Sequence, residues 1–375
     1  MKYPERMARR GPGMRPFHTA IATTFSMEFA AYEEVMLPQL MASGATNFLV
    51  VADERMASMS LSDGSQLPMQ LGRDYELFSP PVGDGLFHPK IVLQIGRKAG
   101  RLFVGSANIT AAGLAGNAET VVELECQDEP SPEREIVRSA WRYVSNLIPQ
   151  EPSAARDALN WANDRAQWLS GSDGEPLQHL DDGSAIAFLT RYGREGIGSR
   201  FLDFIGGDRI ERLVVASPYW DGRLDGLRLL LERLQTDNTT ILLDDEGHEF
   251  PLGTPLPHGV EFRAFPSRLD GRFKHSKFVI ASTATHDHLL IGSANCTRAA
   301  LGGTEFGGTN HEACIYRMLP RDRAVEALGL VECIEAEAVD PEEIEQREAP
   351  APIPLDEIAS RKAGCFELEV ALLTW

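Results

Sequence analysis

The sequence contains the stretch His88-Pro89-Lys90, followed by Gly105-Ser106-Ala107-Asn108, and this pattern occurs twice. The second copy reads His275-Ser276-Lys277 and Gly292-Ser293-Ala294-Asn295. In each copy Lys stands two positions after His, and Asn follows His at the same spacing (88 to 108 and 275 to 295). A repeat of this kind predicts two copies of one structural unit, and therefore a fold with two related halves.

The apolar residues around each motif predict that His and Lys lie on one strand and Asn at the end of the next. Residues two apart in a strand point to the same face, so His88 and Lys90 share a face. A turn then returns the chain, which can place Asn108 beside them. We expect the two halves to face each other and form one phosphate pocket from six side chains: His88, Lys90, Asn108, His275, Lys277 and Asn295.

This set of side chains suits cleavage of a phosphodiester without a metal ion. A neutral imidazole can attack phosphorus, while a second, protonated imidazole gives a proton to the departing oxygen. Two Lys and two Asn can balance the charge on the other phosphate oxygens. A lone His-x-Lys or a lone Gly-Ser-Ala-Asn is most often only a structural feature of a strand. The specific signal is their joint repetition.

The rest of the chain predicts alternating strands and helices. A buried strand is expected at 47–52, and Ser131-Pro132-Glu133 is a typical helix start. A strand at 185–193, a helix and a strand at 210–221 restart the same order. Because the strands are apolar rather than alternating, we expect two α/β sandwich repeats with mixed, largely parallel sheets, packed as a pseudo-twofold bilobal unit.

These patterns divide the chain into five expected segments. They are a flexible basic arm (1–16), an N-terminal half (17–170), a linker (171–184), a C-terminal half (185–320), and an acidic helix or linker ending in a terminal strand (321–375). The acidic run from Glu332 to Glu348 is expected to be solvated, and the alternative is a tail that docks a partner or mimics nucleic acid.

Composition limits the class of protein. The chain has 375 residues and 43% hydrophobic content, enough for a packed core. No apolar run is long enough to span a bilayer and no secretory signal is evident, so we expect a cytoplasmic protein with no membrane association. Five cysteines without metal-ligand spacing suggest reduced thiols rather than disulfides or zinc. The net charge of −19 argues against a general nucleic-acid coat but not against a local basic cleft.

Both stretches resemble the HxK and GSxN signature of the phospholipase D superfamily. The resemblance implies a bilobal fold, one active site at the seam, a phosphohistidine intermediate, and neither metal nor other cofactor. It makes His88 and His275 the nucleophile and the general acid, with the two Lys and two Asn holding the phosphate. A Glu after GSxN often orients an imidazole, which points to Glu119 and Glu312, and Ser106 and Ser293 are expected beside them. A surface role is the alternative for either Glu.

One departure from the family pattern bears on the substrate. The usual Asp after Lys is replaced by Ile95 and Ser282. That Asp is also missing in branches that resemble tyrosyl-DNA phosphodiesterase and the metal-independent restriction endonucleases. We therefore expect a metal-independent hydrolase, a nuclease on DNA or RNA, with a role in bacterial or antiviral defence. The alternatives are a phospholipid or head-group phosphodiesterase and a non-catalytic module that binds phosphate or nucleic acid.

The remaining expectations concern substrate contacts and partners. Arg298 and Lys274 lie next to the motifs and could contact a neighbouring phosphate, and solvent exposure is the alternative. Because the chain is acidic, we expect a helicase or sensor protein to deliver the nucleic acid. The protein is expected to be a monomer with a pseudo-dimeric site, or a homodimer. Which histidine attacks stays open, and analogy with two-lobed relatives favours His88.

Overall fold

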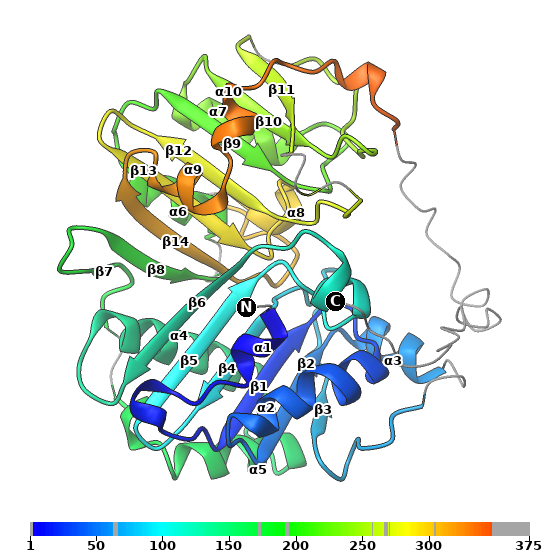
Figure 1. Cartoon of the computed structure of the whole chain (residues 1–375), viewed down its shortest axis with the longest axis vertical. Helices are drawn as coiled ribbons and strands as arrows, with labels where there is room; N and C mark the ends of the chain where they lie inside the picture. Colours follow the sequence, from blue (N-terminus) through cyan, green and yellow to red (C-terminus); the bar gives the residue numbers. More distant parts are fainter. Residues whose placement is uncertain are drawn as a thin grey trace.

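The computed structural model describes residues 3–62, 67–171, 174–191, 195–256, 258–265, 269, 271–303 and 305–346. These residues form two lobes, each built on one β-sheet, stacked along the long axis of the molecule (Figure 1). The first sheet has the order β3 (Glu76–Phe78), β2 (Asn47–Ala52), β1 (Thr19–Thr24), β4 (Ile91–Ile95), β5 (Ala99–Gly105) and β6 (Val121–Gln127). The second has the order β11 (Val260–Ala264), β10 (Thr239–Leu243), β9 (Arg212–Ala216), β12 (Phe278–Ser282), β13 (His286–Gly292), β14 (Cys314–Pro320), β8 (Ala185–Leu189) and β7 (Gln178–His179).

The two sheets confirm the predicted two-lobed α/β fold and correct the expected strand directions. In the first sheet β1, β2 and β3 are parallel, but β4, β5 and β6 are joined to β1 and to each other in antiparallel pairs. The second sheet repeats this arrangement. The sheets are mixed, as expected, but the expectation that they are largely parallel was wrong. The strand after each His-x-Lys is connected to the GSAN strand by a short turn, which forces an antiparallel pair.

The internal repeat also begins at a different strand from the one expected. The first six strands of the second sheet, β11-β10-β9-β12-β13-β14, match β3-β2-β1-β4-β5-β6 in order and direction. The counterpart of β1 is thus β9, and not the strand predicted at 185–193. That strand, β8, pairs with β14 on the far side of the sheet. Apolar character alone could not distinguish the two because both strands are fully buried apart from Arg212.

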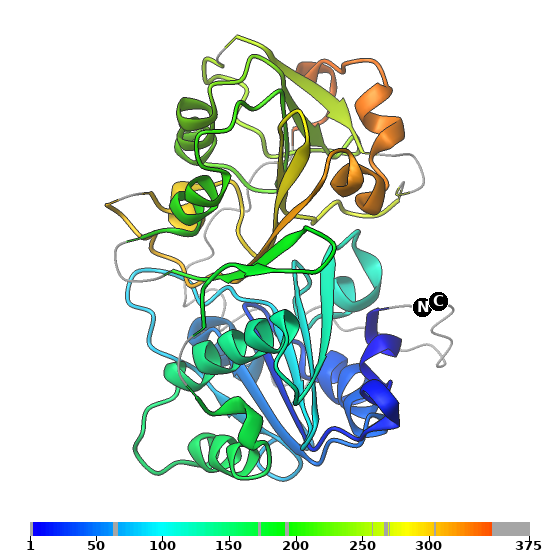
Figure 2. The same cartoon turned by 90° about the vertical axis from the view of Figure 1, so that its left-hand side faces the viewer.

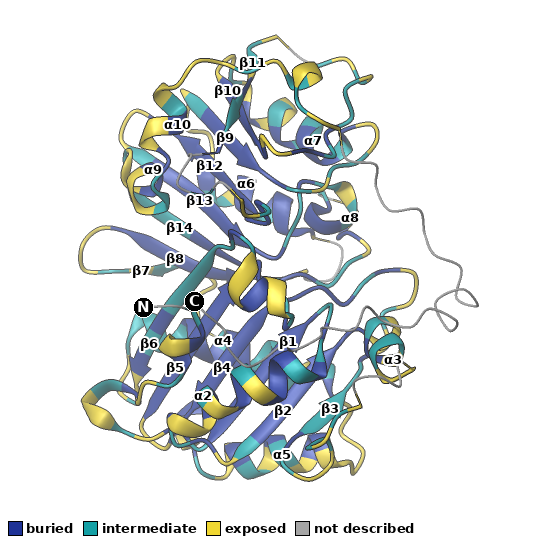
Figure 3. Ribbon diagram, turned by 45° about the vertical axis from the view of Figure 1, so that its right-hand side comes forward, coloured by how far each residue is buried: buried dark blue, intermediate teal, exposed yellow. Residues whose placement is uncertain are grey.

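Helices pack on both faces of each sheet (Figures 1 and 2). One apolar core is shared by the two lobes, and each lobe has a further core of its own. The shared core joins Ile91 and Leu93 of β4 to Ile280 of β12 and Ile315 of β14, so the lobes are connected by packing as well as by chain. Figure 3 shows the buried strands of both lobes enclosed by helices whose outer sides are exposed. The helices are α1 (Tyr3–Met7), η1 (Pro12–Met14), η2 (Ala31–Met36), α2 (Leu37–Ala42), α3 (Glu54–Ser62), η3 (Ala112–Gly116), α4 (Pro132–Leu147), α5 (Ala154–Asn163), η4 (Gln167–Leu169), α6 (Ile197–Ile205), α7 (Asp225–Leu234), α8 (Arg298–Leu301), α9 (Arg323–Leu328), α10 (Val331–Glu335) and η6 (Pro341–Glu343).

The helix α4 begins where the sequence predicts it. The Ser131 side chain accepts a hydrogen bond from the backbone N–H of Arg134 (3.2 Å), and Pro132 occupies the first turn. Both features satisfy or remove amide groups that the first turn leaves without a partner. The apolar face of α4, which includes Ile136, packs in the shared core.

The amino-terminal segment is ordered, which corrects the expected flexible basic arm. Residues 3–16 contain α1 and η1, and Arg101 of β5 holds this segment in place. The guanidinium of Arg101 is fully buried and donates to the backbone carbonyls of Arg6 (3.2 Å), Arg9 (2.7 Å) and Arg10 (2.9 Å). It also pairs with Glu125 (2.6 Å). Long-range hydrogen bonds of this kind cannot be read from the local composition of the arm.

Two further segment boundaries need correction. Gln178 and His179, inside the expected linker 171–184, form β7 at the edge of the second sheet. The described part of the acidic segment, up to residue 346, packs on the second lobe, where Val339 N–H donates to the Phe262 carbonyl (2.8 Å). The predicted terminal strand lies outside the described residues. Among the helices that the structure describes, none is both long and apolar enough to cross a bilayer.

We predict that Arg101→Met destabilises the protein by roughly 3 kcal/mol, because buried carbonyls and the Glu125 carboxylate lose their partner. Urea unfolding measures this change. Limited trypsin digestion should then cut first at the arginines of residues 3–16. Arg97→Ala, an exposed change in the turn before β5, is the matched control and should shift stability by less than about 0.5 kcal/mol. Equal stability of the two variants would contradict the anchoring role of Arg101.

Candidate active site

The two His-x-Lys segments lie at the seam, where each pairs with the chain of the other lobe. The backbone N–H of His88 donates to the carbonyl of His311 (3.0 Å), and that of His275 donates to the carbonyl of Ala118 (3.1 Å). Bridges between Phe87 and His311, and between Ala118 and Lys274, extend both contacts. The two halves are therefore hydrogen-bonded to each other in a symmetric way directly beside the candidate histidines.

Two aspartates that the sequence reasoning missed hold the backbone of the residue before each histidine. The carboxylate of Asp53 accepts from the backbone N–H of Phe87 (2.9 Å), and that of Asp244 accepts from the N–H of Lys274 (3.1 Å). Each aspartate directly follows a buried strand, β2 or β10, and is itself buried. An acidic residue at the same place after equivalent strands was the sequence signal that could have identified the pair.

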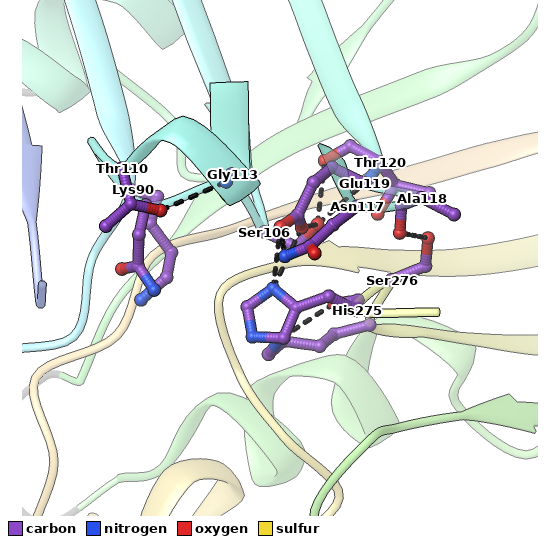
Figure 4. Close-up of polar contacts among 12 residues, drawn as sticks. Lys90, Ser106, Thr110, Gly113, Asn117, Ala118, Glu119, Thr120, His275 and Ser276 are labelled. Atoms are coloured by element: carbon purple, nitrogen blue, oxygen red, sulfur yellow. Dashed lines mark hydrogen bonds and ion pairs between the residues drawn. The ribbon is translucent and has the colours of Figure 1, made fainter. Parts of the chain in front are cut away.

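Each histidine is oriented by a glutamate from the opposite lobe. His88 Nδ1 lies 2.9 Å from Glu312 Oε2, and His275 Nδ1 lies 2.8 Å from Glu119 Oε1. Figure 4 shows the second contact. A carboxylate accepts a hydrogen bond from Nδ1–H, which leaves the Nε2 lone pair of a neutral ring available for chemistry. The structure thus brings together the expected pairs and shows that they cross between the lobes.

The serines of the two GSAN stretches hold these glutamates. Ser106 Oγ donates to Glu119, and Ser293 Oγ donates to Glu312. Asn117, two residues before Glu119, adds a bond from Nδ2 to Oε1 (3.1 Å) (Figure 4). The Asn310 amide approaches Glu312 Oε1 in the same way (3.3 Å). These contacts explain why a buried carboxylate is tolerated, because its oxygens keep their hydrogen-bond partners. The sequence reasoning did not assign a role to either Asn.

The two lysines are buried beside the histidines. Each Nζ donates to the carbonyl of the histidine two residues earlier, at 2.8 Å for both Lys90 and Lys277. Burial lowers the pKa of Lys277 to about 8, and it holds the pKa of Lys90 well below its ordinary value. Burial, with the nearby Lys277 charge, also lowers the pKa of His275 to about 4. The pKa of His88 is lowered mainly by burial too, against the opposing effect of Glu312.

The two asparagines flank this cluster and are only partly buried. Asn108 Oδ1 accepts from the backbone N–H of Ser26 (3.3 Å). Within the described part of the chain, Asn295 Oδ1 has no hydrogen-bond partner although the atom is buried. An unsatisfied buried polar atom is costly, so a bound group with a donor would stabilise the site. Phosphate binding by either Asn stays a prediction.

Lys274 and Arg298, the two residues expected to contact a neighbouring phosphate, lie outside this cluster. The Lys274 side chain is fully buried in an ion cluster, with Nζ 3.2 Å from Asp244, 3.3 Å from Asp245 and 3.6 Å from Glu246, and so does not offer its charge to a substrate. Arg298 is exposed, and its guanidinium lies over the Phe306 ring at 5.2 Å. In the ranges that the structure describes, no three His, Cys, Asp or Glu side chains form a set of metal ligands.

We predict that the seam binds a small dianion in a pH-dependent way. Lys277 is charged below its pKa of about 8 and neutral above it, so the affinity for sulfate should fall about tenfold between pH 7 and pH 9. Sulfate keeps its charge over this range, and calorimetry measures its binding. Lys277→Arg keeps the positive charge and should reduce the fall. Affinity that stays constant or rises with pH would contradict this account.

Comparison with known proteins supports the fold. No family model matches the chain, and no curated protein matches it in sequence. Among solved structures, a variant of yeast tyrosyl-DNA phosphodiesterase 1 aligns at 12% identity with a TM-score of 0.52, over 83% of this chain and 84% of that chain. A second yeast tyrosyl-DNA phosphodiesterase structure aligns at 12% identity with a TM-score of 0.50, over 80% and 82% of the two chains. The chain therefore has the two-lobed fold of these tyrosyl-DNA phosphodiesterase structures, and the bilobal fold that the resemblance implied is confirmed.

Proposed function

We propose that this chain is a phosphodiesterase that cleaves nucleic acid through a covalent phosphohistidine. The observation that carries the proposal is the pair of crossed contacts, His88 with Glu312 and His275 with Glu119. Each lobe supplies one histidine and the carboxylate that orients the other. Such an arrangement needs both lobes. It supplies two imidazoles, one to attack phosphorus and one to transfer the proton in each step of the reaction.

In the first step, Nε2 of one histidine attacks phosphorus. A P–N bond forms, and the bond between phosphorus and the leaving oxygen breaks. The second histidine, in its protonated form, gives its proton to the leaving oxygen. Lys90 and Lys277 balance the charge that develops on the remaining phosphate oxygens, with Asn108 and Asn295 as further donors. Which histidine attacks stays open, and analogy favours His88.

In the second step, water releases the product. The histidine that gave its proton is now neutral and accepts one proton from water. The resulting hydroxide oxygen bonds to phosphorus, and the P–N bond breaks with its electron pair returning to the imidazole. The phosphate monoester leaves, and both rings regain their starting protonation. The step needs no oxidant, no reductant and no substrate other than water.

The lowered pKa values fit this division of roles. In the free protein both histidines favour the neutral form, mainly because they are buried. An anionic phosphodiester beside them favours a positive charge and raises the pKa of the ring that must act as acid. The substrate therefore helps to prepare the general acid, while the carboxylate at Nδ1 keeps the attacking ring in the correct tautomer.

Ile95 and Ser282, which replace the Asp that is usual in the family pattern, favour nucleic acid as the substrate. Ile95 is buried in the shared core, and Ser282 Oγ donates to Asp287 (2.7 Å), both at the far ends of β4 and β12 from the histidines. The missing Asp therefore leaves the seam intact. Branches that lack this Asp resemble tyrosyl-DNA phosphodiesterase, and the two solved structures compared above carry that name.

The acidic chain suggests a partner. Its net charge of −19 opposes long-range attraction of a polyanion, so we propose that a helicase or sensor protein delivers the nucleic acid, as in a bacterial defence system. The local charge of Lys90 and Lys277 would act only once the phosphate has entered the seam.

The first test of this function uses single substitutions of the two histidines. His88→Ala and His275→Ala should each lower the rate of oligonucleotide cleavage by at least about a thousandfold, since each ring has a separate role. His179→Ala, an exposed change on β7, is the control and should keep full activity. Wild-type activity should persist in EDTA. Retained activity in both seam variants, or loss of wild-type activity in EDTA, would refute the mechanism.

The glutamates should matter less than the histidines that they orient. Glu119→Gln and Glu312→Gln should each reduce kcat by roughly 10- to 100-fold with little change in KM, because the ring stays but its tautomer is no longer held by charge. A shift of the pH–rate profile should accompany the loss. Variants with an unchanged pH profile would assign Glu119 and Glu312 a purely structural role.

A further inference from the structure

The loops that follow β1 and β9 share one hydrogen-bonded scaffold. Thr24 Oγ1 donates to the carbonyl of Ser26 (2.6 Å), and Ser217 Oγ donates to the carbonyl of Tyr219 (2.7 Å). Both hydroxyls also accept a backbone N–H from the residue after the GSAN motif (3.0 and 2.9 Å). The internal symmetry of the chain therefore makes Ser26 and Tyr219 equivalent positions beside the two histidines.

A second pair of contacts extends this equivalence. Glu28 accepts the backbone N–H of Ala111 (2.8 Å), and Asp221 accepts the N–H of Arg298 (2.8 Å). In each half, the carboxylate two residues after Ser26 or Tyr219 accepts a hydrogen bond from the backbone of the residue three positions after the Asn of the GSAN motif. Ala111 and Arg298 are therefore equivalent too.

The scaffold is shared, but the side chains that it presents differ. The second lobe carries Tyr219 and the cation Arg298 where the first lobe has Ser26 and Ala111. The first lobe has its own aromatic neighbour, since the ring of Phe25, the residue before Ser26, lies 5.3 Å from that of His88. Tyr219 is 36% exposed, and the centroid of its ring lies 6.2 Å from that of the His275 ring. Arg298 is exposed and lies over Phe306, which is itself 37% exposed. Both histidines therefore have an aromatic neighbour, but only the second lobe adds a cation at the equivalent position, and this difference indicates a specific ligand on its side of the seam.

The chemistry of this side fits one nucleotide. An exposed aromatic ring next to the reacting phosphate can stack on a nucleobase, and a cation fixed nearby can contact the next phosphate. A base inside a duplex is stacked on its neighbours and cannot use the ring without leaving the helix. A lipid head group such as choline or ethanolamine has no planar base to stack. The ring and cation together favour an unpaired nucleotide.

We propose that Tyr219 and Arg298 form a nucleotide platform on the second lobe that selects single-stranded nucleic acid. The proposal rests on the proposed function and specifies its substrate. The base next to the scissile phosphate stacks on Tyr219, and the following phosphate pairs with Arg298. Tyr219 is thus a specificity-determining residue.

The decisive experiment compares one sequence as a single-stranded and as a duplex oligonucleotide. Tyr219→Ala should raise KM for the single strand roughly tenfold, as expected for the loss of one base stack, with kcat within about twofold of wild type. Tyr219→Phe keeps the ring and should stay within about twofold in both constants. An oligonucleotide with an abasic residue next to the scissile phosphate should show the same KM with Tyr219→Ala as with wild type.

The role of Arg298 has its own measurement. Arg298→Ala should weaken binding of the single strand equally for all sequences and reduce the slope of log affinity against log salt by about one phosphate contact. Arg298→Lys keeps the charge and should restore most of that slope. An unchanged slope in Arg298→Ala would remove Arg298 from the platform.

The outcomes separate this inference from the proposed function. Wild-type protein that cleaves no nucleic acid but hydrolyses a lipid diester would overturn both. Wild-type protein that cleaves nucleic acid, together with Tyr219→Ala that has an unchanged KM for the single strand, would overturn the platform alone. A wild-type preference for the duplex would also overturn it. Circular dichroism of each variant controls for folding, and His179→Ala again provides the exposed, distant control.

Discussion

The rest of the structure depends on the hydrogen bonds by which each lobe's carboxylate holds the other lobe's histidine. The Glu312 side chain is completely buried. Burial alone would raise its pKa, but the charge and hydrogen bond of His88, with Lys90 and Ser293, lower the pKa below its ordinary value. Leaving such a carboxylate without these partners would be strongly destabilising. In either lobe alone, the glutamate and the histidine would each lack the partner that the other lobe supplies. Only the complete molecule satisfies these charged and polar groups.

This constraint explains the shape of the seam. The backbone contacts of His88 with His311 and of His275 with Ala118 set the relative position of the lobes, and the shared core around Ile91 and Ile280 keeps it. A site placed between rigidly joined lobes can hold its reacting groups in fixed geometry before substrate arrives, which is the main source of catalytic efficiency in sites without large movements. The same near-symmetry makes the differences between the lobes informative.

Much of the site could be predicted from the sequence because its chemistry is tied to spacing. The repeated His, Lys and Asn predicted one two-lobed fold, and Glu119 with Glu312 were expected beside the histidines. Features that depend on contacts between distant segments could not be predicted. Arg101 orders the basic arm by hydrogen bonds to its backbone carbonyls, and Lys274 pairs with acidic residues in a buried ion cluster. The exact start of the repeat at β9 became visible only once strand pairing was known. The aspartates after β2 and β10 did leave a signal in the sequence, an acidic residue at the same place after two apolar strands.

The most direct test of the account is to trap the covalent intermediate. A single-stranded oligonucleotide is mixed with the protein, the reaction is stopped with alkali because phosphohistidine survives it, and the peptides are mapped by mass spectrometry. The account predicts one phosphorus–nitrogen adduct for each chain, at Nε2 of either His88 or His275 but not of both. Adducts on both histidines of one chain, or an adduct on neither while cleavage proceeds, would contradict a single centre built from two half-sites.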